Sequence, residues 1–139
     1  MNRIIHSRIF IVLLVTLTAL PFLSLQQNKF DLEASISRGK EIYTAQCMSC
    51  HMENGEGLEG AFPPLAKSDY LMADQKRAVL QILNGLSGEI TVNGKTYYGD
   101  MPAFDLTDEE VSDVLNYVQN SWSNKAKAVL PEDVKKLRN

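Results

Sequence analysis

The sequence predicts a small, mainly helical domain that carries one short β-hairpin. Apolar residues recur at helical spacing between residues 32 and 43 and again between residues 107 and 118. Between these two segments, Asn93-Gly94 separates two short runs of strand-forming residues, a pattern that is typical of a tight hairpin turn. At 139 residues the chain has the length of one domain, and it shows no internal repeat.

The first predicted helix leads directly into the two cysteines of the chain. Leu32, Ile36, Gly39 and Tyr43 lie three or four residues apart and therefore share one face of a helix. Glycine in the interior of a helix costs roughly 1 kcal/mol relative to alanine. We therefore expect Gly39 to be there because another part of the chain approaches the helix closely.

A middle helix and a hairpin are predicted between the cysteines and the late helix. The helix runs from about Gln75 to Leu83. The segment EITVNGKTYYG, residues 89–99, then places the Asn93-Gly94 turn between strand-forming residues. Four apolar residues of the middle helix are expected to be buried: Val79, Leu80, Ile82 and Leu83.

The late helix has a complete start signal. Thr107 is the predicted N-cap, and Glu110 lies three residues further on, where the two side chains can form a capping box. Pro131 opens a short predicted helix near the C-terminus, because proline is favoured at the first helical position. The predicted apolar face of the late helix consists of Val111, Val114, Leu115 and Val118.

The N-terminal 25 residues differ from the rest of the chain. Arg3 and Arg8 flank a short polar head, and an apolar run from Ile9 to Leu25 follows, interrupted by Pro21. A positive head before an apolar run is typical of an export signal. The run only just reaches the roughly 17–25 residues of a membrane span. We expect residues 1–25 to export the chain, either as a cleaved signal or as a retained membrane anchor, and residues 26–139 to form one exported, periplasmic domain.

The charge balance argues against nucleic acid as a partner. The formal net charge is -3, with acidic and basic residues interspersed along the chain. Without Arg3 and Arg8, 12 of the 14 basic residues remain against 17 acidic ones, so the exported part has a net charge of -5. This excess favours protein partners with a basic or mostly apolar surface.

The cysteine and histidine side chains that could bind a metal or a cofactor are concentrated in the segment CMSCH, residues 47–51. Cys47 and Cys50 are the only cysteines, and the one other histidine, His6, precedes the predicted export segment. A structural zinc site needs four ligands, a disulfide would close a very small loop, and a redox pair would need a preceding strand. C-x-x-C-H is instead typical of covalent haem c attachment, with His51 as proximal iron ligand.

With these segments in place, the chain resembles the class I c-type cytochromes, specifically exported bacterial proteins with one haem. This resemblance implies an all-α fold of helices around one covalently bound haem, with a short hairpin before the distal methionine loop. The first and last core helices are expected to cross, with Gly39 and Tyr43 near Tyr117. The motifs that carry the resemblance are Gly39-x-x-x-Tyr43, CMSCH, FPPLAKSDYL (residues 62–71), GDMPAF (residues 99–104) and DVLNYV (residues 113–118).

The resemblance places Met101 at the M-P position that supplies the sixth iron ligand in this family. Met48 and Met52 flank the attachment motif on the side of His51, so neither is expected to reach the opposite side of the ring. Histidine and methionine together close both axial positions, and such an iron exchanges electrons. Three alternatives stay open: coordination by Met72, coordination by Lys95, and an open sixth position with Met101 as a core-filling side chain.

Four further residues are predicted to support the haem and its ligands. The match to FPPL makes the backbone carbonyl of Pro63 the expected hydrogen-bond acceptor for His51, which would orient the imidazole. Tyr97, Tyr98 and Trp122 are candidates to donate hydrogen bonds to the haem propionates. For these three aromatic residues, plain packing is the alternative interpretation.

The function implied is one-electron transport between periplasmic or membrane redox proteins, through transient contacts. No catalytic constellation is present in the sequence, so we expect neither an enzyme nor a small-molecule substrate. Two other functions stay open. The chain could be the dedicated electron-input subunit of one oxidoreductase, such as a nitrite reductase, an alcohol dehydrogenase or a terminal oxidase. It could also be a haem-based gas sensor in which a ligand displaces Met101.

Overall fold

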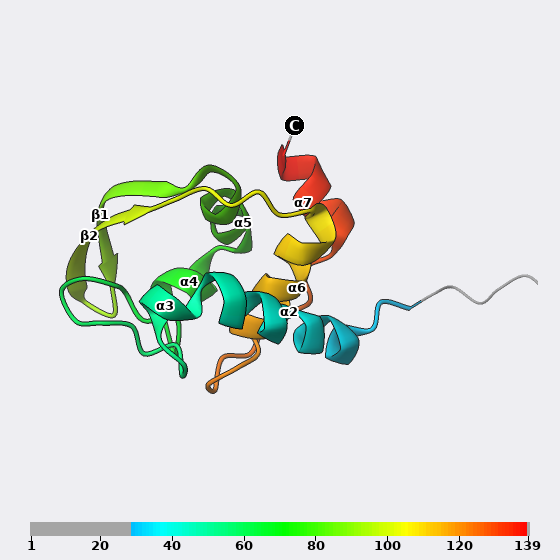
Figure 1. Cartoon of the computed structure of the whole chain (residues 1–139), viewed down its shortest axis with the longest axis horizontal. Helices are drawn as coiled ribbons and strands as arrows, with labels where there is room; N and C mark the ends of the chain where they lie inside the picture. Colours follow the sequence, from blue (N-terminus) through cyan, green and yellow to red (C-terminus); the bar gives the residue numbers. More distant parts are fainter. Residues whose placement is uncertain (1–28, 139) are drawn as a thin grey trace, which may run out of the picture.

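The computed structural model describes residues 29–138, so the predicted export segment lies outside the described part (Figure 1). This part is helical with one two-stranded sheet, as the sequence predicts. Its elements in chain order are α2 (Leu32–Gln46), α3 (Met48–His51), α4 (Asp69–Ala73), α5 (Gln75–Asn84), β1 (Leu86–Val92), β2 (Lys95–Met101), α6 (Asp108–Val118) and α7 (Pro131–Arg138).

Helices α2 and α6 cross in the centre of the molecule and make its most extensive contact between elements (Figure 1). Gly39 of α2 lies at the crossing. A Cβ atom built on Gly39 would lie 1.9 Å from the carbonyl oxygen of Asp113 and 2.9 Å from the Cβ atom of Tyr117. The expected close approach at Gly39 is therefore present, and the partner is the backbone of α6.

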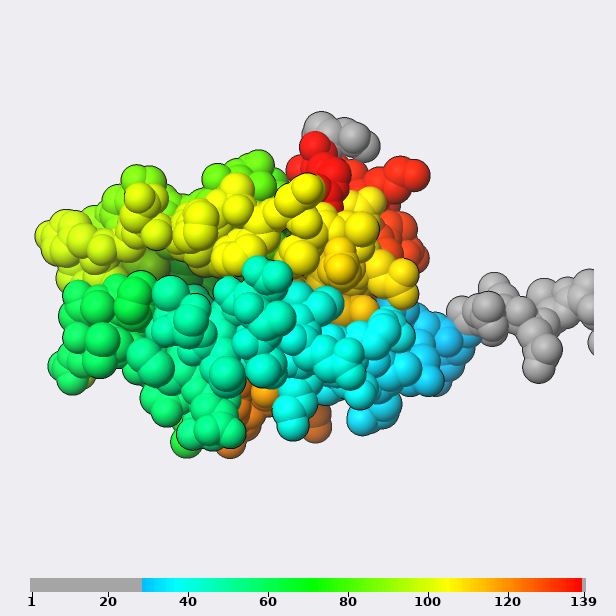
Figure 2. Space-filling model, viewed as in Figure 1, coloured from blue at the N-terminus to red at the C-terminus, as the bar shows by residue number. Residues whose placement is uncertain are grey.

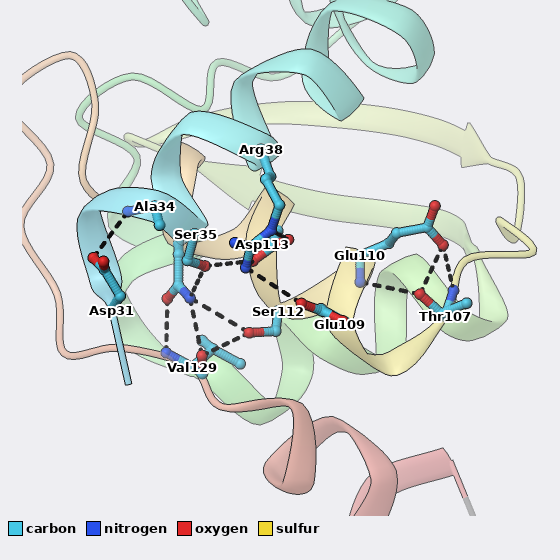
Figure 3. Close-up of polar contacts among 11 residues, drawn as sticks. Asp31, Ala34, Ser35, Arg38, Thr107, Glu109, Glu110, Ser112, Asp113 and Val129 are labelled. Atoms are coloured by element: carbon cyan, nitrogen blue, oxygen red, sulfur yellow. Dashed lines mark hydrogen bonds and ion pairs between the residues drawn. The ribbon is translucent and has the colours of Figure 1, made fainter. Parts of the chain in front are cut away.

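A buried polar cluster joins the two crossing helices to the segment before α7 (Figure 3). Arg38 donates two hydrogen bonds to the carboxylate of Asp113, at 2.6 and 2.8 Å, and Ser35 donates a third at 2.6 Å. The side chain of Asn116 donates to Ser35 at 2.8 Å and to the carbonyl of Val129 at 2.9 Å, and it accepts from the N–H of Val129 at 2.8 Å. Ser35, Asp113 and Asn116 are buried, whereas Arg38 reaches the cluster from the exposed side. Because the buried groups have partners, they hold the segment in place without the cost of unpaired polar atoms.

The middle of the chain forms two short helices where one was predicted. Helix α4, absent from the sequence-based prediction, begins after Ser68, whose hydroxyl accepts a hydrogen bond from the N–H of Leu71. Helix α5 follows with Asp74 as its N-cap. Its apolar face buries Val79 and Ile82, but Leu80 is 37% exposed. The prediction that Leu80 is buried was therefore wrong.

The hairpin places Met101 beside the end of α5. Strands β1 and β2 pair around the Asn93-Gly94 turn, with Val92 opposite Lys95 at the turn and Leu86 opposite Met101 at the open end. Figure 1 shows the hairpin at the end of the molecule that lies opposite α7.

The late helix begins as predicted. Thr107 and Glu110 form both hydrogen bonds of a capping box. The four predicted core residues Val111, Val114, Leu115 and Val118 are all buried, and α7 begins at Pro131. Within residues 29–138, no helix is both long enough and apolar enough to cross a membrane.

Candidate haem site

The two cysteines and His51 are presented by one turn of helix. Helix α2 ends at Gln46, the C-cap residue Cys47 donates its N–H to the carbonyl of Tyr43, and α3 begins at Met48. The N–H of His51 donates to the carbonyl of Cys47 at 3.0 Å. Residues three and four positions apart on a helix are neighbours, so Cys47, Cys50 and His51 face the same side. Both thiols are free and partly buried.

Burial keeps Cys47 and His51 in their neutral forms. It raises the pKa of the Cys47 thiol to about 11, and the neighbouring Cys50 adds to this shift. Burial also lowers the pKa of His51, although its hydrogen bond to Pro63 opposes the change. At neutral pH Cys47 is therefore a thiol rather than a thiolate, and His51 is a neutral imidazole with one nitrogen free to bind a metal.

The orientation of His51 is set by the loop after α3. Its Nδ1 atom lies 3.0 Å from the carbonyl oxygen of Pro63. A carbonyl can only accept, so Nδ1 carries the proton and Nε2 is left with its lone pair. This is the contact that the sequence comparison with FPPL predicted for these two residues.

Close backbone packing holds Pro63 in that place. Gly57 lies in the left-handed region, with φ +64°, and its N–H donates to the carbonyl of His51 at 3.1 Å. A Cβ atom on Gly57 would lie 2.3 Å from the carbonyl oxygen of Phe62 and 2.8 Å from that of Pro63. The sequence alone does not reveal this contact, because it forms only when the segment of Phe62 and Pro63 folds back onto Gly57.

His51 and Met101 both line one hollow, which has an inner and an outer part. The inner part is a cavity of about 90 Å³, and the outer part is a cavity of about 500 Å³, which is within the ~300–1,000 Å³ typical of cofactor pockets. The outer cavity continues to the surface between α3 and β2, and Figure 2 shows a recess between these segments. Both cavities are lined by Cys47, His51, Pro63, Leu86, Ile90 and Met101.

The walls of this hollow are mainly apolar and come from distant parts of the chain. Ile82 of α5, with Val114, Leu115 and Val118 of α6, lines the inner part. Cys50, Phe62, Tyr98 and Phe104 line the outer part. In residues 29–138 there is no group of three or more His, Cys, Asp or Glu side chains that could hold a metal ion directly. Two thiols, one imidazole and one thioether around an apolar cavity fit a covalently attached, planar haem.

The three aromatic residues proposed near the propionates lie in different environments. Tyr98 is 74% exposed and lines the outer cavity. Tyr97 is buried with Ile90 and Val92 in the small core under the hairpin. Trp122 packs against Tyr43, with ring centroids 5.2 Å apart, and also against Tyr117. Only Tyr98 of the three lines either cavity, and the propionate roles stay predictions.

Two other candidates for the sixth ligand lie elsewhere. Lys95 is at the hairpin turn, where its Nζ atom forms an exposed ion pair with Glu59 at 2.6 Å. Met72 packs against the main core in α4 and lines neither cavity of the hollow. Met101 lines both.

The family model for cytochrome c matches residues 36–122, which contain every residue of this site. The chain belongs to the cytochrome c family. It therefore carries one covalently bound haem c, and it transports electrons through the haem iron.

Curated relatives include cytochromes c and cytochrome c subunits of enzymes. A cytochrome c-552 of Thermus thermophilus is 44% identical to this cytochrome over 110 residues, covering 72% of this chain and 83% of the relative. The cytochrome c subunit of a quinone-dependent alcohol dehydrogenase of Gluconobacter oxydans is 33% identical over 104 residues, covering 72% of this chain and 22% of the relative. A subunit of a cbb3-type cytochrome c oxidase of Azospirillum brasilense is 30% identical over 110 residues, covering 74% of this chain and 34% of the relative.

Proposed function

We propose that Cys47 and Cys50 attach the haem and that His51 and Met101 are its two axial iron ligands. The observation that supports this assignment is that all four side chains line one apolar hollow. In the attachment, each thiol adds across one vinyl group, so that a carbon–sulfur bond forms and the thiol hydrogen passes to the other vinyl carbon. The high pKa of Cys47 means that its proton is present at neutral pH for this addition.

The residues of the hollow then determine how the iron behaves. The haem supplies one iron atom that gains or loses a single electron. His51, held by Pro63, presents Nε2 as a ligand in one fixed orientation. Met101 would supply the second iron ligand, which would leave no free coordination site for small molecules. The apolar residues of α5 and α6 exclude water from the ring, and a haem enclosed in this way is favoured in its reduced form.

In this proposal, the protein is an electron shuttle that works outside the cytoplasm and has no catalytic activity of its own. Export would come from residues 1–25, which lie outside the described structure. Electrons would enter and leave through the outer part of the hollow, where Tyr98 is 74% and Phe62 37% exposed. The net charge of -5 on the exported part favours partners with a basic or apolar surface. With a basic partner, added salt should slow electron transfer.

A second candidate function is a dedicated electron-input subunit of one oxidoreductase. The observation that favours it is the match to cytochrome subunits of an alcohol dehydrogenase and of a terminal oxidase. Purification of the full-length protein from its native membranes and periplasm separates the two functions. A shuttle should be recovered alone or with several proteins in small amounts, whereas a subunit should be recovered with one enzyme in a fixed ratio.

A carbon monoxide difference spectrum of the ferrous holoprotein tests the ligand assignment. The protein would be made with its export segment and a haem-attachment system. We expect no spectral change with the wild type, and a clear carbonyl spectrum with Met101→Ala. Carbon monoxide binding by the wild type would favour a gas sensor instead. A Met101→Ala protein that also fails to bind carbon monoxide would show that another residue is the sixth ligand.

A further inference from the structure

The glycine that ends α5 has a conformation that only glycine adopts readily. Gly85 has φ 77° and ψ -178°, and its N–H donates to the carbonyl of Gln81 at 2.9 Å. For residues with a side chain, this combination of angles is strongly disfavoured. The sequence-based prediction ended the middle helix near this point and assigned no role to the glycine.

Gly85 touches the backbone of the loop that carries Met101. A Cβ atom on Gly85 would lie 2.6 Å from the carbonyl oxygen of Met101, 3.0 Å from the nitrogen of Ala103 and 3.2 Å from the carbonyl carbon of Pro102. All three are backbone atoms, so no side chain can rotate away to make room. An added methyl group would have to displace the loop itself.

Two backbone contacts hold the same loop on either side of Gly85. Before the loop, Met101 pairs with Leu86 at the open end of the hairpin. After it, the N–H of Phe104 donates to the carbonyl of Ile82 at 2.9 Å. Ile82, Gly85 and Leu86, which we call the α5 clamp, therefore fix the loop at both ends and in the middle.

Two residues of the α5 clamp, Ile82 and Leu86, line the inner cavity together with Met101. The position of the loop against α5 therefore sets how far Met101 reaches into that cavity. A shift of the loop backbone away from Gly85 would change the position of Met101 in it.

We propose that Gly85 is a positioning residue that keeps Met101 within reach of the haem iron. The proposal rests on the function proposed above for Met101 as the sixth ligand. Gly85 itself touches neither the iron nor Met101 sulfur. It acts by having no side chain where the α5 clamp meets the loop.

The test compares Gly85→Ala with Gly60→Ala in the holoprotein. Gly60 has the same φ of +77°, but a Cβ atom there would have nothing within 4 Å. This control places a side chain at a positive φ, as Gly85→Ala does, but without the collision. We expect Gly85→Ala to weaken the long-wavelength absorption band of ferric haem bound to a methionine sulfur. It should also raise the affinity of the ferrous protein for carbon monoxide at least about tenfold, equivalent to about 1.4 kcal/mol. Gly60→Ala should resemble the wild type in both.

A Gly85→Ala protein with an intact methionine band and no gain in carbon monoxide affinity would overturn the proposal. Equal changes in the two glycine variants would overturn it as well, because strain alone would then account for the effect. The Met101→Ala spectrum keeps the two proposals apart. If Met101→Ala leaves the band in place, the ligand assignment fails, and not only the role of Gly85.

If Gly85→Ala cannot be obtained with haem bound, a measurement on the wild-type protein tests the proposal instead. Imidazole would be added to the ferric protein to displace the methionine, and amide hydrogen exchange would be followed. We expect the Phe104 N–H, which bonds to Ile82, to exchange at least about tenfold faster as the loop leaves the clamp. The Gly57 N–H, which bonds to His51, serves as the control and should be unchanged. Unchanged exchange at Phe104 would overturn the proposal.

Discussion

The backbone carbonyl of Asp113 occupies the space where a side chain on Gly39 would be. The distance from an ideal Cβ atom at Gly39 to that oxygen is 1.9 Å. The two residues are far apart in the sequence, yet their contact sets how closely α2 and α6 cross. Since α2 leads directly into Cys47 and the attachment residues of α3, and α6 lines the inner cavity, this contact also helps to position the two sides of the haem site.

We expect Gly39→Ala to destabilise the protein even though alanine is the better helix former. The preference for alanine is worth about 1 kcal/mol, but overpacking against a backbone atom costs about 1–3 kcal/mol or more. Urea unfolding should therefore show a net loss. Gly99→Ala is the matched control, because a Cβ atom there has nothing within 4 Å. A Gly39→Ala protein as stable as the wild type would contradict the close crossing.

Replacement of Asn116 by alanine should loosen the segment before α7. Four hydrogen bonds of its side chain, two of them to the backbone of Val129, would be lost inside the protein. Buried groups left without partners cost about 1–3 kcal/mol, and thermal unfolding should record a loss of that size. Glu109→Ala, on the exposed side of the same helix, should change stability by less than about 0.5 kcal/mol. Equal effects of the two substitutions would argue against the buried cluster.

Gly57→Ala should act on the iron through His51. The new methyl group would collide with the carbonyls of Phe62 and Pro63 and pull Pro63 from the imidazole. Without that acceptor, His51 is a less basic ligand and stabilises ferric iron less. We expect the reduction potential to rise, and a tenfold shift between the oxidation states corresponds to about 59 mV. Voltammetry of Gly60→Ala provides the comparison, because Gly60 also has a positive φ and a Cβ atom there would have nothing within 4 Å. A potential that falls or stays constant would refute this role.

The capping box makes part of the stability dependent on pH. Hydrogen bonds from the backbone and side chain of Thr107 lower the pKa of Glu110 in the folded protein below its usual 4.5. Because the folded pKa is the lower one, this contribution is present above about pH 4.5 and is lost as the pH falls through the folded pKa. The stability difference between wild type and Glu110→Gln should thus be constant near neutral pH and shrink in acid. Glu109→Gln controls for the loss of one charge, and parallel pH profiles for the two variants would contradict the prediction.

Features that depend on neighbouring residues in the sequence were predicted correctly. The capping box, the Asn93-Gly94 turn and the apolar face of α6 all follow from residues within a few positions of one another. Helix α4 was missed because its start depends on Ser68, and a single serine within a proline-containing loop is a weak signal. Leu80 was placed inside because it belongs to an apolar run, but the neighbours that cover α5 lie on the other face.

By itself, the sequence determined that the chain attaches a haem, since C-x-x-C-H needs only one helical turn to bring its three side chains together. It also pointed to Gly39 as a place of close approach. The tertiary structure alone decided what approaches Gly39, that Ser35, Asp113 and Asn116 form one buried cluster, and that Gly85 meets the Met101 loop. Each of these contacts joins segments that are separated along the chain. The spacing of residues along the sequence indicates which of them share a face of a helix. What packs against that face is determined only when distant segments of the chain come together.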